Sequence, residues 1–155
     1  MKMIALPLIS VSAMSVLLYG CYSPTPTKDD IKGRWYSADG AVIELRADGS
    51  YVAKQIDYNS IYLEKEYKGK KIDFVGKCEI ISEDKKWKLE LYTDATFKDI
   101  GINKTYTYNG EIRSHRLGLT FEISGEGILE NKPPWHLFVW IGDPDNGNRY
   151  KFEKR

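Results

Sequence analysis

The sequence predicts an all-β fold, either an antiparallel barrel of eight or nine strands or a closely related sandwich. From Asp29 onward, apolar and polar residues alternate along most of the chain, which is the period of a half-buried strand. Short turns rich in Gly, Asn, Asp and Ser separate these segments, and no amphipathic pattern of ten residues or more predicts a long helix. Residues 29–155 are long enough for a single β-barrel domain with its own core.

The strands are predicted in hairpin-linked order. Segments 42–46 and 50–53 flank the turn 47–49 and form the first hairpin. Residues 57–69 fit either a loop followed by a strand, which we favour, or a short helix capped by Ser60. The other strands are expected at 72–80, 87–92, 105–113, 117–123, 135–141 and 149–153.

The strand expected at 135–141 is apolar at consecutive positions. In one interpretation His136, Phe138 and Trp140 face outward, and the two aromatic rings form a contact patch. In the other, segment 126–134 covers the strand, which is then buried on both faces. The second interpretation is slightly favoured, because a two-sided apolar run is typical of two-sided burial.

Residues 1–20 are predicted to be a lipoprotein signal peptide. Lys2 supplies a positive start, and the apolar run 4–18 has the length of a signal peptide but falls short of the ~20 residues that span a bilayer. The motif Leu18-Tyr19-Gly20-Cys21 resembles the lipobox of bacterial lipoproteins. This resemblance implies that Cys21 is lipidated on sulfur and becomes the acylated N-terminus.

The segment 21–28 is rich in Pro, Thr and Ser and is expected to be a flexible tether between Cys21 and the domain. Durable attachment takes at least two acyl chains, and the triacylation of this family meets that condition. No Asp follows Cys21, a pattern that resembles lipoproteins sorted to the outer membrane in enteric-type bacteria. The expected location is therefore the cell envelope, lipid-anchored at the outer membrane and facing the periplasm.

The charge balance excludes some partners. Loss of residues 1–20 removes Lys2 alone, which leaves 22 basic side chains against 22 acidic ones. A near-neutral domain argues against nucleic acid, which needs a basic stripe. It also argues against electrostatic binding to membranes, since Lys68–Lys71 is the main basic cluster.

A Gly-x-Trp pattern, Gly33 to Trp35, precedes the first strand, and the turn 48–51 follows it. This arrangement resembles the lipocalin-like (calycin) proteins. The resemblance implies that Trp35 plugs one closed end of a barrel and that a basic residue near the C-terminus packs over it. Arg149 and Arg155 are the candidates, and we expect Arg149.

A barrel of eight strands is either filled by side chains or holds one small ligand. The chain supplies large residues that could fill the interior, which are Trp35, Phe74, Trp87, Tyr106, Tyr108, Phe121 and Trp135. The candidate contacts for a ligand or partner are Tyr106, Tyr108, His136, Phe138 and Trp140.

No catalytic residue, metal site or cofactor is predicted. His115 and His136 have no second ligand at metal-binding spacing, and no nucleophile motif occurs. Cys78 lies on the apolar face of its strand and is expected in the core. Residues 143–148 fit a plain turn better than a calcium loop.

The sequence therefore predicts a membrane-anchored envelope lipoprotein that binds rather than transforms its partner. A small apolar or amphipathic ligand inside the barrel is the favoured occupant. The alternative is a protein-binding lipoprotein, such as an immunity protein or an inhibitor of an envelope-targeted enzyme, that uses an exposed aromatic patch. Catalysis is the least favoured function.

Overall fold

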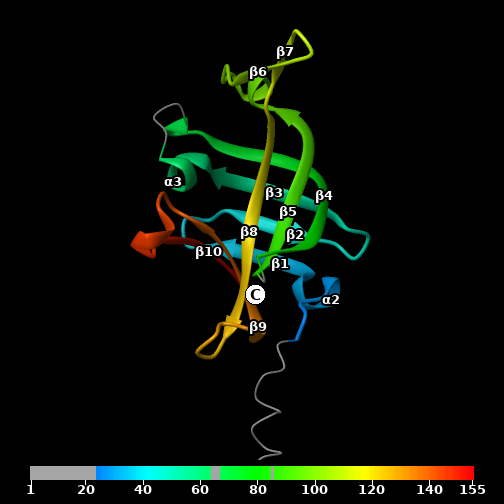
Figure 1. Cartoon of the computed structure of the whole chain (residues 1–155), viewed down its shortest axis with the longest axis vertical. Coiled ribbons are helices and arrows are strands. Elements are labelled where there is room, and N and C mark those ends of the chain that lie inside the picture. The colour runs from blue at the N-terminus through cyan, green and yellow to red at the C-terminus, as the bar shows by residue number, and fades with distance from the viewer. Residues whose placement is uncertain (1–23, 64–66, 85) are drawn as a thin grey trace, which may run out of the picture.

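The computed structural model describes residues 24–63, 67–84 and 86–155, and it shows a closed antiparallel barrel. The strand order is β1-β10-β9-β8-β5-β4-β3-β2 (Figure 1). Each barrel strand pairs with the barrel strands that precede and follow it in the chain, and the last pairs with the first. The predicted all-β class is confirmed, as a barrel rather than a sandwich. The strands are β1 (Gly33–Ser37), β2 (Val42–Leu45), β3 (Ser50–Asp57), β4 (Lys71–Glu83), β5 (Lys86–Thr96), β8 (Arg116–Glu126), β9 (Lys132–Trp140) and β10 (Arg149–Lys154).

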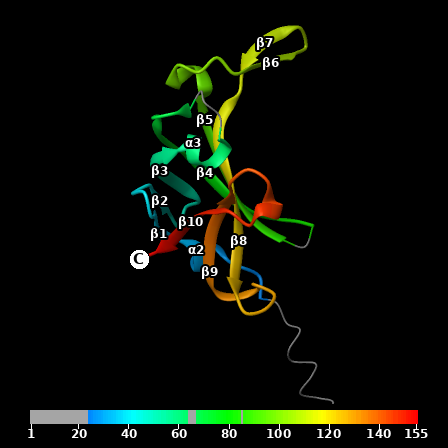
Figure 2. The same ribbon diagram turned by 90° about the vertical axis from the view of Figure 1, so that its left-hand side faces the viewer.

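A separate hairpin of β6 (Thr105–Tyr108) and β7 (Glu111–Ser114) lies between β5 and β8 in the chain and projects beyond one end of the barrel (Figures 1 and 2). The prediction of one continuous strand over 105–113 is wrong. Asn109 and Gly110 both have positive φ, 50° and 81°, which the two-residue turn of a hairpin requires.

Side chains fill the barrel. Alternate residues of each strand point inward, and an eight-stranded barrel is just wide enough for them to meet. The largest fully buried side chains are Trp35, Tyr51, Tyr58, Tyr67, Phe121 and Phe152. Of the predicted fillers, Trp35, Phe74, Phe121 and Trp135 are buried and Trp87 is half-buried, whereas Tyr106 and Tyr108 are exposed on the hairpin.

Helix α2 (Lys28–Ile31) leads into the first strand of the barrel. Thr27 and Asp30 form a reciprocal capping box, and Ile31 is buried. The indole nitrogen of Trp35 donates to the carbonyl oxygen of Ile31 at 2.7 Å, which ties the helix to the barrel. Pro26 is also buried, so packing begins earlier than the predicted tether boundary at residue 28.

Lys154, and not Arg149, is the basic residue over Trp35. Its ammonium lies 5.8 Å from the centroid of the Trp35 ring and donates to the carbonyl oxygen of Asp30 at 2.9 Å. Strand register explains the correction: Trp35 pairs directly with Lys154, while Arg149 pairs with Trp140 near the other end of β10. Gly33, with a φ of 120°, leaves room for this side chain, because a Cβ there would lie 3.1 Å from Cε of Lys154.

The opposite part of the barrel is closed by aromatic rings. The predicted loop at 57–69 is wrong for its first residues, because helix α3 (Tyr58–Tyr62) starts there, capped by Asp57 rather than Ser60. The 3-10 helix η3 (Phe97–Ile100) contributes another ring. Rings in contact with Tyr58, at centroid distances of 5.5 to 6.1 Å, belong to Tyr62, Tyr67, Phe74 and Phe97. Within the described residues, no helix is long and apolar enough to cross a bilayer.

Replacement of Trp35 by Ala is expected to lower the free energy of unfolding by roughly 3–5 kcal/mol, because it empties a fully buried site and removes the bond to Ile31. Lys154→Met keeps the aliphatic stem and should cost about 1 kcal/mol or less. Urea unfolding followed by circular dichroism measures both. A loss below about 1 kcal/mol for Trp35→Ala would show that Trp35 does not anchor the barrel end.

Candidate binding groove between two barrel strands

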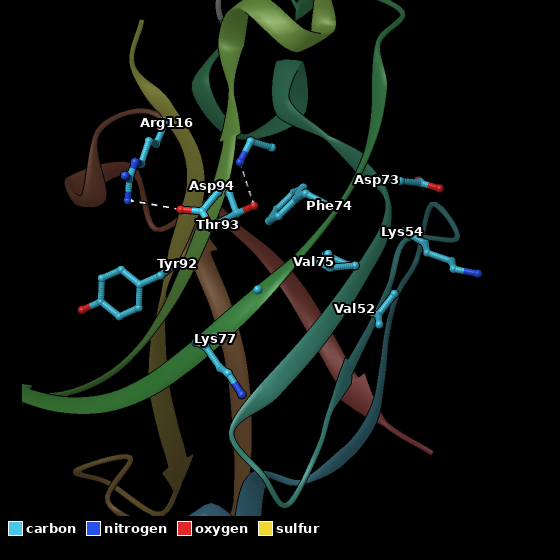
Figure 3. A pocket seen from close by; sticks show the side chains of 13 residues that line it. Val52, Lys54, Asp73, Phe74, Val75, Lys77, Tyr92, Thr93, Asp94 and Arg116 are labelled. Atoms are coloured by element: carbon cyan, nitrogen blue, oxygen red, sulfur yellow. Dashed lines mark hydrogen bonds and ion pairs between the residues drawn. The ribbon is translucent and has the colours of Figure 1, made fainter. Parts of the chain in front are cut away.

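Strand β4 changes partner along its length. Its first half, Lys71 to Lys77, pairs with β3, and its second half, Lys77 to Glu83, pairs with β5. Beyond the pair Lys77–Tyr92 the two strands separate, and β5, after an irregularity between Tyr92 and Thr96, pairs again with β8 at Thr96. The separation leaves a groove of about 730 Å³ in the barrel wall (Figure 3).

Gly76 sits where the two backbones come closest. A Cβ atom at this position would lie 1.8 Å from the carbonyl oxygen of Tyr92, far inside any real contact. Only a residue without a side chain permits this approach, which is a recurring use of Gly inside strands. The closed end of the groove is therefore set by one glycine.

The groove has an apolar floor and a charged rim. Val75 is 60% exposed on it, and the buried ring of Phe74 separates it from the core. The volume lies within the range of small-molecule sites, roughly 300–1,000 Å³. Charged residues along it are Lys54, Asp73, Lys77, Asp94 and Arg116, three cationic and two anionic.

The rim carboxylates already have partners. Arg116 Nη1 lies 3.6 Å from Asp94 Oδ1, an exposed and therefore weak ion pair. Asp73 Oδ1 accepts from the backbone N–H of Gln55 at 2.8 Å, where Gln55 has a φ of 57° in a bulge of β3. Among the described residues neither Lys54 nor Lys77 forms an ion pair, so the groove keeps two cationic groups for a ligand.

Tyr92 stands at the groove wall with its ring half-exposed (Figure 3). Its hydroxyl donates to the carboxylate of Glu90, and because this bond favours the neutral phenol, it raises the pKa of Tyr92 to about 12. Tyr92 is therefore neutral at physiological pH and offers the groove a flat apolar face. Thr93, beside it, is buried and accepts from the N–H of Ala95 at 3.2 Å.

Tyr51 lies behind the groove, inside the wall. Its side chain is 1% exposed and packs edge-on against Phe74 at 5.9 Å between ring centroids. The hydroxyl faces Thr93, yet it makes no hydrogen bond with the described residues. Burial raises the pKa of Tyr51, which stays a neutral donor. A buried hydroxyl without a partner is unusual in native proteins.

Cys78 follows the groove on β4. It is half-buried and packs against the core, as the alternation predicts. Burial raises the pKa of the Cys78 thiol, which keeps it protonated and a poor nucleophile.

Three of the predicted contact residues lie on another part of the wall. Phe138 is buried and Trp140 half-buried, and the guanidinium of Arg149 lies 4.3 and 4.8 Å from their ring centroids. Arg149 also donates to both carboxylate oxygens of Glu130, at 3.2 Å each. Arg149 of β10, held by Glu130, thus covers the outer side of Phe138, which is buried on both faces, while Trp140 stays partly exposed. His136 is half-buried nearby on the same strand.

The other predicted contact residues do not join this cluster. Tyr106 and Tyr108 lie on the projecting hairpin, where Tyr106 stacks on His115 at 4.8 Å between centroids. Cys21 falls outside the described residues. None of the predicted contact residues lines the groove between β4 and β5. The one sequence signal for the groove is Gly76 in the middle of a strand pattern, which is typical of a close backbone approach.

The remaining polar clusters are structural. The turn predicted at 143–147 is confirmed: the 3-10 helix η4 (Pro144–Asn146) is capped by Asp143, which accepts from the N–H of Asp145 at 3.0 Å. In the described ranges, no three His, Cys, Asp or Glu side chains gather as they would around a metal ion.

Comparison with known proteins finds no family model, no curated protein and no solved structure that matches the chain. The resemblances to bacterial lipoproteins and lipocalin-like proteins thus rest on the motifs at Leu18–Cys21 and Gly33–Trp35 alone.

Two buried tyrosines provide a matched test of this geometry. The hydroxyl of Tyr58 donates to the carbonyl oxygen of Gly118 at 2.9 Å and accepts from its N–H at 3.1 Å, so Tyr58→Phe should cost about 1–3 kcal/mol of stability. Tyr51→Phe removes a hydroxyl that makes no hydrogen bond with any described residue and should change stability by less than about 0.5 kcal/mol, or increase it. Urea unfolding compares the two variants; equal losses would show that Tyr51 has a partner.

Proposed function

We propose that the protein is a lipid-anchored binding protein of the cell envelope and that its ligand occupies the groove between β4 and β5. The ligand class is a small amphipathic molecule with an anionic group. The observation that carries the proposal is the groove itself, a ligand-sized hollow with an apolar floor and two lysines, Lys54 and Lys77, for which the described part of the chain provides no ion-pair partner. The lipobox-like motif ending in Cys21 supports the anchor.

The filled interior moves the expected site from the centre of the barrel to its wall. Trp35, Phe121 and Phe152 occupy the core, and Tyr58 with its neighbouring rings closes the mouth. A ligand in the groove would lay its apolar part over Val75 and the ring of Tyr92. Its anionic group would lie within reach of Lys54 and Lys77, which line the rim beside the apolar floor.

Binding rather than catalysis is proposed because of the residues that line the groove. Its polar groups are two lysines, two aspartates, an arginine, Thr93 and Tyr92. Thr93, the one aliphatic hydroxyl, is engaged with the N–H of Ala95 instead of a general base. Such a set binds and orients an anion, while a nucleophile would need an adjacent base.

The groove is tested by native mass spectrometry of the protein released gently from membranes. The wild type is expected to carry a reproducible extra mass of a few hundred daltons, the size that a groove of this volume accepts. Val75→Glu places a carboxylate on the floor and should weaken retention at least tenfold, since each 1.4 kcal/mol is a factor of ten. Ile112→Glu on the hairpin is the matched control and should keep the mass. Equal retention in both variants would place the ligand elsewhere.

A second candidate function is protein binding through the β6–β7 hairpin. Ile112 is 78% exposed at its end, and Tyr106 and Tyr108 are also exposed. The guanidinium of Arg113 stacks on the ring of Tyr108 at 5.1 Å. Tyrosine and arginine dominate binding energy at protein interfaces, and the hairpin projects clear of the barrel (Figure 2).

The hairpin candidate predicts a stoichiometric complex with an envelope-targeted enzyme or another envelope protein. Ile112→Glu combined with Tyr108→Ala should weaken that complex more than tenfold, because both changes remove exposed apolar contacts. Photo-crosslinking from position 108 in intact cells identifies the partner, and calorimetry with the purified pair measures the loss. Val75→Glu is the control. A complex that tolerates the hairpin changes but not Val75→Glu would assign the interface to the groove.

A further inference from the structure

The turn between β8 and β9 presents two large apolar side chains to solvent. The N–H of Glu130 donates to the carbonyl oxygen of Gly127 at 3.0 Å, which makes Gly127–Glu130 a β-turn with Ile128 and Leu129 at its centre. Turn centres are ordinarily Gly, Pro, Asn, Asp or Ser. Here Ile128 is fully exposed and Leu129 is 75% exposed. Adjacent exposed residues of this kind indicate a contact surface.

The turn is held in place from both sides. The N–H of Gly125 donates to the carbonyl oxygen of Glu130 at 2.6 Å, across the base of the turn. The carboxylate of Glu130 is bound by Arg149, whose guanidinium lies against Phe138 and Trp140. Ile128 and Leu129 therefore lie on a turn whose backbone position is fixed by hydrogen bonds, at one corner of the barrel.

This corner lies beside the start of the described chain. Pro24 and Leu129 line the same pocket of about 310 Å³, and both views place the β8–β9 turn close to the segment that leads into α2 (Figures 1 and 2). Cys21 precedes Pro24 by only three residues. Three residues span at most ~11 Å when fully extended. A membrane anchor at Cys21 would therefore keep this corner a short distance from the bilayer.

We propose that Ile128 and Leu129 insert into the interfacial region of the bilayer that carries the lipid of Cys21. The inference rests on the lipid anchor of the proposed function and adds a second point of contact. Charges around the turn are mixed, with Glu126 and Glu130 against Lys132. The contact is therefore apolar, and it should not need anionic lipids.

Two points of contact fix an orientation. The β6–β7 hairpin lies at the far end of the molecule from the β8–β9 turn (Figure 1). With Ile128 and Leu129 at the membrane, the hairpin points away from the bilayer. Strands β4 and β5, whose residues line the groove, lie between these two ends (Figure 1).

The test uses the full chain, matured and lipidated in cells, purified in detergent and reconstituted into phosphatidylcholine vesicles. In a Cys78→Ala background, Ile128→Cys and, as the matched control, Ile112→Cys are labelled with an environment-sensitive fluorophore. The label at position 128 is expected to shift to the blue and to be quenched by lipids with a nitroxide near the headgroup. The label at position 112 is expected to report water. Added Leu129→Asp should reverse much of the shift at position 128.

The outcomes separate the inference from the anchor. Vesicle flotation reports the anchor alone: protein that fails to float overturns lipid attachment and the inference with it. Protein that floats with position 128 as water-exposed as position 112 overturns the inference and leaves the anchor standing. A blue shift at position 128 without nitroxide quenching would also overturn it, because the turn would then contact protein.

Discussion

The close approach of β4 and β5 at Gly76 is the constraint on which the outer surface of this barrel depends. With the Tyr92 carbonyl where a Cβ would otherwise lie, the two strands meet and then diverge, and each keeps its other neighbour. Divergence opens the wall without breaking the closed order of the strands. Phe74 and Tyr51 then seal the core behind the opening. One position without a side chain thus sets where the wall opens, and two buried rings separate that opening from the packed interior.

The two ends of the barrel are closed by different means, so a ligand or partner would meet the outer surface of the barrel. At one end, Trp35 is held by Ile31 and covered by Lys154. At the other end, aromatic rings pack around Tyr58, whose hydroxyl forms hydrogen bonds with the backbone carbonyl and N–H of Gly118. The groove, the hairpin and the β8–β9 turn all lie on the outside of this packed frame.

The fold class was predictable because alternation reports burial directly, and it needs no knowledge of which strands pair. The features that depend on which strands pair, and in which register, could not be predicted from the sequence. Arg149 and Lys154 are both cationic residues of β10, and only the register of β1 against β10 puts Lys154 over Trp35. The groove arises where two strands stop pairing, which no local pattern records apart from Gly76. The hairpin is different, since Asn109-Gly110 is a local signal that the longer alternation around it obscured.

The way the hairpin joins the barrel bears on how this protein can diversify. Thr96 of β5 pairs with Arg116 of β8, and the N–H of His115 donates to the carbonyl oxygen of Lys104 at 2.9 Å, so the base of the excursion is closed before β6 begins. Residues 105–114 contribute nothing to the barrel ladder. Doubling the length of such an excursion adds only about 0.6 kcal/mol of closure entropy. A ribbon of another length or composition could therefore replace this one at little cost to the closure of the barrel beneath it.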